Sequence, residues 1–423
     1  MKFIADLHIH SKFSRATAKN LNFENLHISA QLKGITVVGT GDFTHPKWFS
    51  EIKEKLVPAE EGLFKLKDEI ANKCNKQIPI SCRGNVRFIL QCEISNIYKK
   101  NGKTRKNHNL IFVPDIKTAF HLNSKFDAIG NIKSDGRPIL GLDAKDLLEI
   151  ILQSSDKSFL IPAHIWTPWF SVLGSKSGFN SLEECFEDLT HHIFSVETGL
   201  SSDPPMNWRI SELDGLTLVS NSDAHSPMNL GRNANLFNTE LSYTAIRSAL
   251  ISGNPNCCLG TLDFYPEEGK YHYDGHRKCN ICMHPNESIA NNRICPVCRK
   301  PLTLGVLYRV KQLADRPKGG KPIKTLPFFK IIPLTNILSD IFEVGPKTKK
   351  VGGYYKSALK TLGPELMILY SYPLHKIDEA GIPLLGEAIR RMRNNKLQIS
   401  PGYDGEYGKV KIFKPEEKEK LLG

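Results

Sequence analysis

Short apolar runs recur through the first half of the chain and alternate with segments of helical periodicity. The runs have the length of buried strands and lie at 3–6, 35–40, 86–93, 110–113, 159–164, 193–197 and 216–221. Between most of them, apolar residues three and four positions apart indicate helices at 25–32, 63–73, 144–153, 181–189 and 243–252. A strand followed by a helix, repeated about seven times, is typical of a βα barrel. We therefore predict an α/β fold with a distorted (β/α)7 barrel.

One connection in this series differs from the others. Residues 96–107 form a basic, glycine-containing loop without helical periodicity. We expect 86–94 and 108–113 to pair as an antiparallel hairpin across it. In that geometry the end of one strand lies beside the start of the next, which would bring Glu93 and His108 together.

The βα rhythm is lost from residue 256 onward. A compact cysteine-containing module spans 279–298, and a Pro/Gly-rich linker follows at 315–322. Beyond the linker the chain is mainly helical, with helices expected at 333–342, 354–361, 365–371 and 384–394. We predict three units: a barrel (1–255), a linker with a zinc-binding module (256–310) and a basic, mainly helical carboxyl-terminal domain (311–423).

Charge is distributed unevenly over these units. The 423 residues are 40% apolar and 24% charged, as in soluble globular proteins, and the net charge is +13. Residues 1–269 carry 29 basic and 30 acidic side chains, whereas residues 306–423 carry 22 and 12. Such asymmetry favours nucleic acid as a partner over a merely solvated surface. No apolar run is long enough to span a membrane and no leader is evident, so we expect a cytoplasmic protein.

Ligand-type side chains stand at the ends of the predicted strands. His8 and His10, two positions apart on one strand, would point to the same face. The carboxyl ends of barrel strands converge on one mouth, and the other strand ends offer Asp42, Glu93, His108, His164, Asp223 and His225. Imidazole and carboxylate suit zinc and manganese, and magnesium is a further option. The sequence therefore predicts a multinuclear site for divalent cations.

Four of the ten cysteines form a second metal-binding pattern. Cys279-x-x-Cys282 and Cys295-x-x-Cys298 are separated by twelve residues, a spacing that closes one tetrahedral Zn²⁺ site of four thiolates. Such a site has no open position, so we expect a structural role. The other six cysteines show no disulfide spacing, which indicates reduced thiols.

The strand-end motifs resemble those of the PHP (polymerase and histidinol phosphatase) superfamily of metal-dependent phosphoesterases. The resemblance implies that His8, His10, Glu93 and Asp223 hold one metal, and that Glu93 bridges to a second held by His108 and His164. A third would use Asp42 and His225. It also implies hydrolysis by a metal-bound hydroxide, with Asp223, Glu93 and His164 as catalytic residues.

The order of barrel, four-cysteine module and basic helical tail resembles the endonuclease Q family of DNA repair nucleases. That resemblance implies cleavage on the 5′ side of deaminated bases (uracil, hypoxanthine or xanthine) or of abasic sites. It implies damaged DNA as partner, with replication or repair clamp proteins as further partners, no membrane contact and a monomer. Candidate DNA contacts are Trp166, Trp169, Phe170, Lys176, Arg232, Tyr403, Tyr407 and Lys409.

Two other functions stay open at this point. One is a small-molecule phosphoesterase of the histidinol phosphatase kind, although such an enzyme has little use for a basic tail. The other is a non-catalytic DNA-binding or polymerase-associated module with a decayed barrel. Retention of the complete set of histidines and carboxylates argues against decay.

Overall fold

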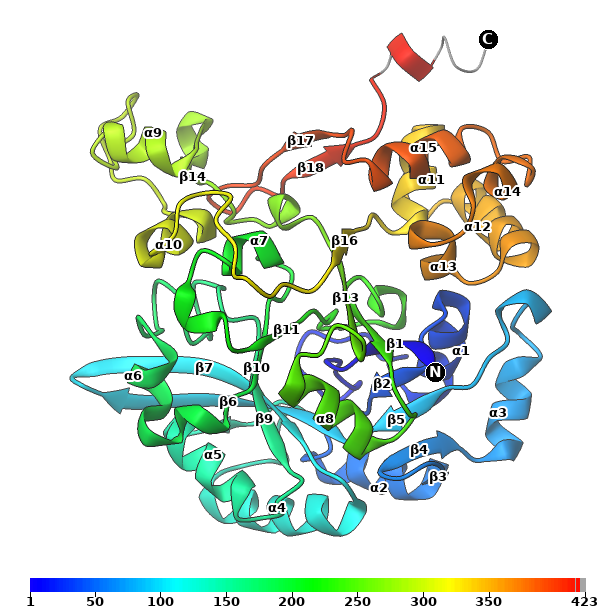
Figure 1. Cartoon of the computed structure of the whole chain (residues 1–423), viewed down its shortest axis with the longest axis vertical. Coiled ribbons are helices and arrows are strands. Elements are labelled where there is room, and N and C mark those ends of the chain that lie inside the picture. The colour runs from blue at the N-terminus through cyan, green and yellow to red at the C-terminus, as the bar shows by residue number, and fades with distance from the viewer. Residues whose placement is uncertain (415, 419–423) are drawn as a thin grey trace.

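The computed structural model describes residues 1–414 and 416–418, and its amino-terminal part is a mixed α/β unit (Figure 1). Seven strand positions follow one another around its centre, because β5 and β6 are one strand interrupted only at Leu90. They are β1 (Lys2–Asp6), β2 (Val37–Gly39), β5 (Arg87–Ile89) with β6 (Gln91–Lys100), β7 (Lys103–Phe112), β9 (Phe159–Pro162), β10 (Ser195–Glu197) and β11 (Thr217–Val219).

The hydrogen bonding around this ring is discontinuous. β1, β2 and β5 pair in parallel, whereas β7 is antiparallel to both β6 and β9. Ile165 N donates to Glu197 O (3.0 Å) between the ends of β9 and β10, and a bridge between Ile9 and Ala224 joins the chain after β11 to the chain after β1. The strands thus close a distorted barrel, as the repeat predicts.

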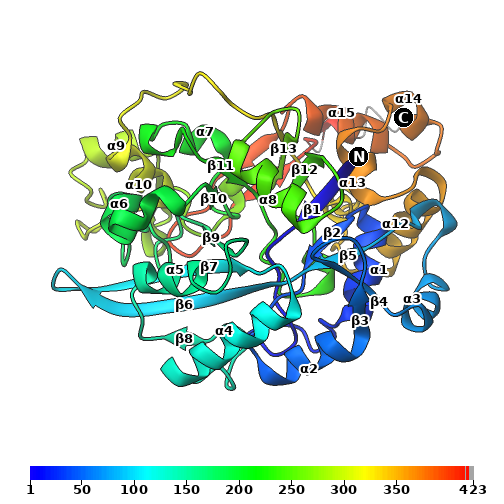
Figure 2. The ribbon, with the colours of Figure 1, turned by 60° about the horizontal axis from the view of Figure 1, so that its bottom comes forward.

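The predicted hairpin is present but longer than expected. β6 and β7 pair along their whole length and project from the barrel (Figure 2). They turn at Asn101 and Gly102, both at positive φ (54° and 71°), as a two-residue hairpin turn requires. Residues 96–107 are therefore mostly strand and not a loop, because this turn lets the two chains continue to pair.

Helices cover the outside of the barrel. They are α1 (Phe23–Lys33), α2 (Pro46–Lys55), α3 (Asp68–Asn75), α4 (Ile116–Ile129), α5 (Ala144–Leu152), α6 (Leu182–Phe186), α7 (Pro204–Asn207) and α8 (Tyr243–Ser252). Several begin where a polar side chain accepts a hydrogen bond from the first turn, as Ser242 does from Ala245 N. The single helix expected over 63–73 is wrong: β4 (Leu63–Leu66) pairs with β5 and with β3 (Leu56–Pro58), and α3 begins only afterwards.

Three further strands extend the sheet beyond β1. β12 (Ala234–Asn238) is antiparallel to β1, followed by β13 (Cys258–Asp263) and by β16 (Phe328–Lys330), which runs parallel to β13. β16 lies beyond the linker, so the carboxyl-terminal segment contributes a strand to the sheet of the barrel.

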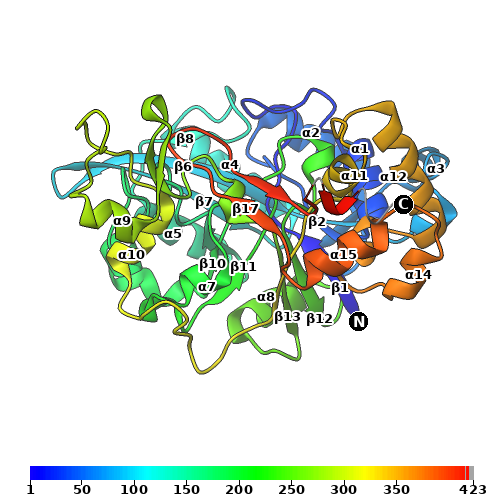
Figure 3. The ribbon, with the colours of Figure 1, turned by 90° about the horizontal axis from the view of Figure 1, so that it is seen from above.

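The remaining chain forms two neighbouring parts. The cysteine module contains β14 (Asp274–His276), β15 (Ile281–Met283), α9 (Pro285–Ala290) and α10 (Val306–Leu313). The helical part contains α11 (Leu334–Phe342), α12 (Lys349–Leu362), α13 (Glu365–Tyr370), α14 (Leu374–Asp378) and α15 (Leu385–Arg393). A hairpin of β17 (Gln398–Ser400) and β18 (Lys409–Lys411) runs back from α15 toward the module (Figure 3).

One apolar core extends from the barrel into the helical part. Phe23 and Leu26 of α1 belong to the same buried cluster as Leu366 and Leu369 of α13. A search of the described residues for a helix long and apolar enough to cross a bilayer finds none.

Candidate metal centre

His8 and His10 follow directly on β1 and reach one carboxylate pair. His10 Nε2 lies 3.0 Å from Asp223 Oδ1 and 3.3 Å from Glu93 Oε2. His8 Nε2 lies 3.5 Å and 3.7 Å from the same two oxygens. These four residues, predicted to hold one metal, therefore place their ligand atoms in one small group.

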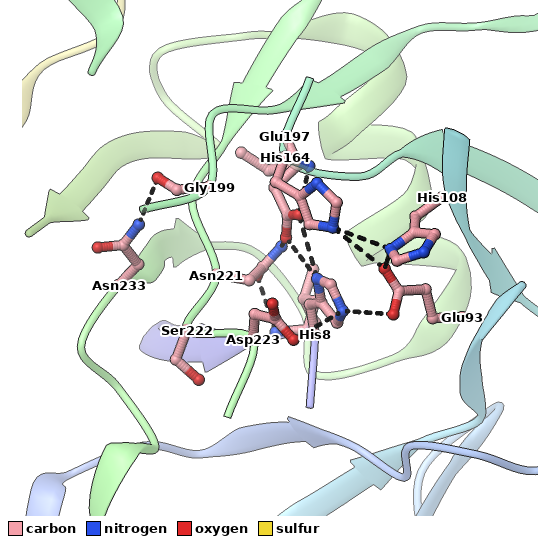
Figure 4. A network of polar contacts seen from close by, with 12 residues as sticks. His8, Glu93, His108, His164, Glu197, Gly199, Asn221, Ser222, Asp223 and Asn233 are labelled. Atoms are coloured by element: carbon pink, nitrogen blue, oxygen red, sulfur yellow. Dashed lines mark hydrogen bonds and ion pairs between the residues drawn. The ribbon is translucent and has the colours of Figure 1, made fainter. Parts of the chain in front are cut away.

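The other oxygen of Glu93 belongs to a second group. Glu93 Oε1 lies 2.9 Å from His108 Nδ1 and 3.3 Å from His164 Nε2, and the two imidazoles are 3.2 Å apart (Figure 4). Glu93 thus presents one oxygen to each group, which is the arrangement that a carboxylate bridging two cations needs.

The donor atoms themselves fit metal ions. His8 Nε2, His10 Nε2, Glu93 Oε1 and Asp223 Oδ1 are buried, and each lacks a hydrogen-bond partner among the described residues. Buried polar atoms without partners are costly, and imidazole with carboxylate is the donor set that Zn²⁺ or Mn²⁺ takes. The residues present therefore fit divalent cations at both groups.

The buried carboxylates of the cluster favour positive charge on the groups around them. Burial alone would lower the pKa of His8, but the carboxylates of Glu197, Asp223 and Glu93 raise it well above its usual value. Burial would raise the pKa of Glu93, yet His108, Arg137 and His8 hold it well below the usual range. Burial lowers the pKa of His108 to about 4, although the charge of Glu93 opposes this shift.

Neither residue of the third predicted metal pair, Asp42 and His225, belongs to a group of three or more candidate ligands among the described residues. Both oxygens of Asp42 are engaged: Oδ1 lies 3.1 Å from His10 Nδ1, and Oδ2 accepts from Ser11 N (2.7 Å) and Ser14 Oγ (2.8 Å). His225 Nδ1 lies 2.8 Å from the backbone oxygen of Asp223. Asp42 is therefore placed to orient His10, and its role as a ligand of a third metal stays a prediction.

Glu197 is a residue of the site that the sequence analysis missed. This buried carboxylate at the end of β10 lies 3.1 Å from His8 Nδ1 and accepts from His164 N (2.8 Å) and Asn221 Nδ2 (2.8 Å). It fixes the ring of one candidate ligand and the backbone of another. Its position at a strand end is the signal that could have found it.

Hydrogen bonds to Asp6, at the end of β1, hold the loop that carries Asp223. Asp6 Oδ1 accepts from Ser222 N (3.0 Å), and its Oδ2 accepts from Gly231 N (2.8 Å). Asp42, His164 and Asp223 all have positive φ (43°, 30° and 48°), which is strained for residues with a side chain. Such strain persists where the surroundings over-determine the backbone, and it clusters at functional sites.

The cysteine module presents a different fourth donor from the predicted one. Cys279, Cys295 and Cys298 group with His276, whose Nδ1 lies 3.5 Å from Cys298 Sγ. Cys282 pairs with Gly275 across the β14–β15 hairpin, so it lies on the opposite face from His276. On that face its Sγ lies 3.9 Å from Pro401 O, and the prediction of four cysteines differs from the structure in this one residue.

The predicted DNA contacts differ in accessibility. Trp166 is wholly buried and donates to Asn207 Oδ1 (2.8 Å), which is at odds with a contact to DNA. Trp169 is 52% exposed and Tyr407 is 68% exposed. Lys176 and Lys409 are exposed, whereas Phe170, Arg232 and Tyr403 are half-buried. The ring of Phe170 packs against His108 (4.7 Å between centroids), so it lines the metal centre.

Comparisons with known proteins agree with this fold over nearly the whole chain. A crystal structure of the novel lesion-specific endonuclease PfuEndoQ from Pyrococcus furiosus superposes with a TM-score of 0.85 at 30% identity, covering 99% of this chain and 97% of the other. A structure of endonuclease Q in complex with a 27-mer duplex substrate with an abasic lesion at the active site gives 0.83 at 30% identity, covering 99% and 98%.

Sequence relatives extend the comparison. Protein YqxK of Bacillus subtilis is 27% identical over 428 residues, covering 97% of this chain and 99% of the relative. Protein MJ0043 of Methanocaldococcus jannaschii is 32% identical over 262 residues, and this chain spans about a third (32%) of its length. The family model of the MJ0043 C-terminal domain matches residues 333–396, which cover α11 to α15.

The α/β fold with its carboxylate-bridged histidine groups defines a metal-dependent endonuclease. The chain matches two endonuclease Q structures over 99% of its length, at 30% identity. It belongs to the endonuclease Q family.

Proposed function

We propose that this protein is a DNA repair nuclease that nicks one strand on the 5′ side of deaminated bases or abasic sites. The observation that carries the proposal is the Glu93-bridged pair of ligand groups, set in a fold that matches a structure holding duplex DNA with an abasic lesion. The match extends through the cysteine module and the basic helical part, which supports a substrate longer than a small phosphate ester.

The residues of the site have distinct parts in this reaction. The two ligand groups would hold divalent cations (Zn²⁺, Mn²⁺ or Mg²⁺), which would acidify a bound water and offset charge on the phosphate. Glu93 would fix the spacing of the two ligand groups, because it gives one carboxylate oxygen to each. Asp223 has a quarter (26%) of its side chain exposed, so it can accept a proton from the attacking water and orient it.

Surface residues near the site support contact with DNA. The exposed Trp169 is the neighbour in sequence of Phe170, which lines the metal centre. Lys106 Nζ lies 5.3 Å from the centre of the Trp169 ring. An exposed aromatic beside a lysine suits stacking on a displaced base and pairing with a phosphate. Arg232 is half-buried near Asp223, and its side chain makes no hydrogen bond with a described residue, which leaves it free for a phosphate.

The test is cleavage of end-labelled oligonucleotides that differ at one position: uracil, hypoxanthine, an abasic site or an undamaged base. We expect a nick on the 5′ side of the lesion, abolished by chelator and by Asp223→Asn, and absent from undamaged DNA. Hydrolysis of small phosphate monoesters with no cleavage of any oligonucleotide would replace the proposal with the phosphatase alternative. DNA binding without hydrolysis of either substrate would favour the non-catalytic module.

A further inference from the structure

Arg137 enters the metal centre although no strand-end motif contains it. Its Nη1 lies 3.0 Å from Glu93 Oε2, the oxygen that faces His8 and His10. About a quarter (24%) of the side chain is exposed, whereas Glu93 is wholly buried. The guanidinium therefore stands between the bridging carboxylate and solvent, at the open side of the cluster.

The loop that carries Arg137 is fixed to the first motif. Gly136 N donates to Phe13 O (3.0 Å), and Asp135 Oδ1 accepts from Arg15 N (3.2 Å) and Arg137 N (3.0 Å). A Cβ added at Gly136 would lie 2.2 Å from Asp42 Oδ2, so only glycine allows this approach. The loop of Arg137 is thus tied to the chain after His10 and packs against Asp42, the residue that orients His10.

Arg137 has hydrogen-bond donors left for an anion. A guanidinium is always protonated; Glu93 accepts its one side-chain hydrogen bond to a described residue, and the carboxylates of Asp223 and Asp135 also act on its charge. A permanent cation beside bound divalent cations is repelled unless an anion lies between them. Nε and Nη2 make no hydrogen bond with any described residue, so the planar fork still has donors to offer.

We propose that Arg137 is a catalytic residue that contacts a non-bridging oxygen of the scissile phosphate. This inference rests on the proposed nuclease function, which supplies the phosphodiester. Because donors are left on its planar guanidinium, Arg137 can bind the phosphate before the reaction. The same contact can stabilise the negative charge that develops on the phosphate oxygens during attack. It would work with Glu93 and Asp223 and would not replace them.

The first test is the single-turnover rate of lesion cleavage by Arg137→Ala and Arg137→Lys. We expect a loss of about 100-fold or more for alanine and a smaller loss for lysine, which keeps the charge but lacks the fork. Lys133→Ala is the matched control, because Lys133 lies on the same loop with its side chain 66% exposed toward Asp127. An alanine variant that cleaves at the rate of the wild type would overturn the inference.

A second test separates phosphate contact from a structural effect without using cleavage. In the Asp223→Asn background we would measure binding of lesion oligonucleotides whose scissile linkage is either phosphate or neutral methylphosphonate. The quantity of interest is the ratio of the affinity for the phosphate oligonucleotide to that for the methylphosphonate oligonucleotide. We expect this ratio to fall toward 1 when Arg137→Ala is added, with unchanged metal content. Equal weakening for both oligonucleotides, leaving the preference intact, would contradict the contact.

The two proposals fail differently. A wild-type protein that leaves every lesion intact removes the nuclease function itself. A wild-type protein that nicks lesions, with Arg137→Ala equally active, removes only the role of Arg137.

Discussion

Residues outside the two ligand groups of the barrel hold the predicted ligands in place. Asp42 orients His10 and Glu197 orients His8, each through the ring nitrogen that faces away from the metal group. The sequence indicated the ligands because histidine and carboxylate at strand ends are unusual side chains for a core. It could not separate a ligand from its support, because Asp42 and Glu197 occupy the same kind of position and only packing distinguishes them.

Glu197→Gln tests this support. The amide keeps the shape of the side chain but loses the charge that raises the pKa of His8, so the ring is held less firmly. We expect metal affinity to fall by about 10- to 100-fold, as is typical when such a supporting partner is lost. The measurement is a competition titration with a metal chelator, with Glu240→Gln on the exposed surface as control. Unchanged affinity in Glu197→Gln would show that Glu197 is only a packing residue.

Asp263 predicts a pH dependence of stability. Burial raises its pKa to about 7, opposed by hydrogen bonds from Thr261 and Ser220. A raised carboxyl pKa favours the folded state at low pH, so this contribution is complete below about 4 and is lost as pH rises toward 7. Asp263→Asn should therefore gain stability relative to wild type between pH 5 and pH 8.

Between pH 5 and the folded pKa of about 7 the carboxyl is protonated in the folded state and ionised in the unfolded state. At about 1.4 kcal/mol per pKa unit, Asp263→Asn should therefore gain on the order of 3 kcal/mol over the wild type from pH 5 to pH 8. Urea unfolding of both proteins at the two pH values measures this gain. The same difference in unfolding free energy at pH 5 and pH 8 would argue against a protonated Asp263 in the folded state.

At the level of secondary structure, the regular βα units were predictable and the added strands were not. α8 spans the predicted 243–252, because its apolar spacing and its Ser242 cap are both local signals. β12, β13 and β16 were missed, since they join the sheet of β1 through pairings between segments distant in sequence. The Asn101-Gly102 turn is a local signal that the sequence analysis did not use.

The cysteine module is held together by few apolar residues, so its metal group should carry much of its stability. Cys295 is buried, but Ile294 and Val297 beside it are exposed. We expect Cys279→Ser to release one zinc ion per chain and to lower the melting temperature, because structural zinc binding is coupled to folding. Elemental analysis and thermal melting measure both, with Cys257→Ser as a control outside the module. Retained zinc and an unchanged melting temperature would contradict a structural metal site.

In the whole molecule, the barrel and the helical part are joined by a buried ion pair as well as by the shared core. Glu365 of α13 lies 3.3 Å from Lys33 Nζ of α1 and accepts from Tyr355 Oη (2.8 Å) and Leu334 N (2.9 Å). This contact and the pairing of β13 with β16 cross the predicted boundary at residue 311. Composition could suggest this boundary. It could not reveal the contacts between the barrel and the helical part, because they join residues far apart in the chain.

Glu365→Gln should lower the free energy of unfolding by about 3 kcal/mol or more, because it leaves Lys33 buried without a charge partner. Denaturant unfolding measures this, and Glu379→Gln on the surface of the helical part serves as control. We also expect barrel and helical part to unfold in a single transition in the wild type. Two separate transitions, with only one shifted by the variant, would show that the two parts fold independently.

The most direct test of the central claim is the metal content of the folded protein and of Glu93→Gln. Because Glu93 alone among the described residues shares both ligand groups, wild type should bind two divalent ions at the barrel in addition to the zinc of the module. The variant should keep the module zinc and lose both of the others, together with strand cleavage. Wild-type protein with no more than one bound ion per chain, or a variant that retains the full complement and cleaves DNA, would contradict the account.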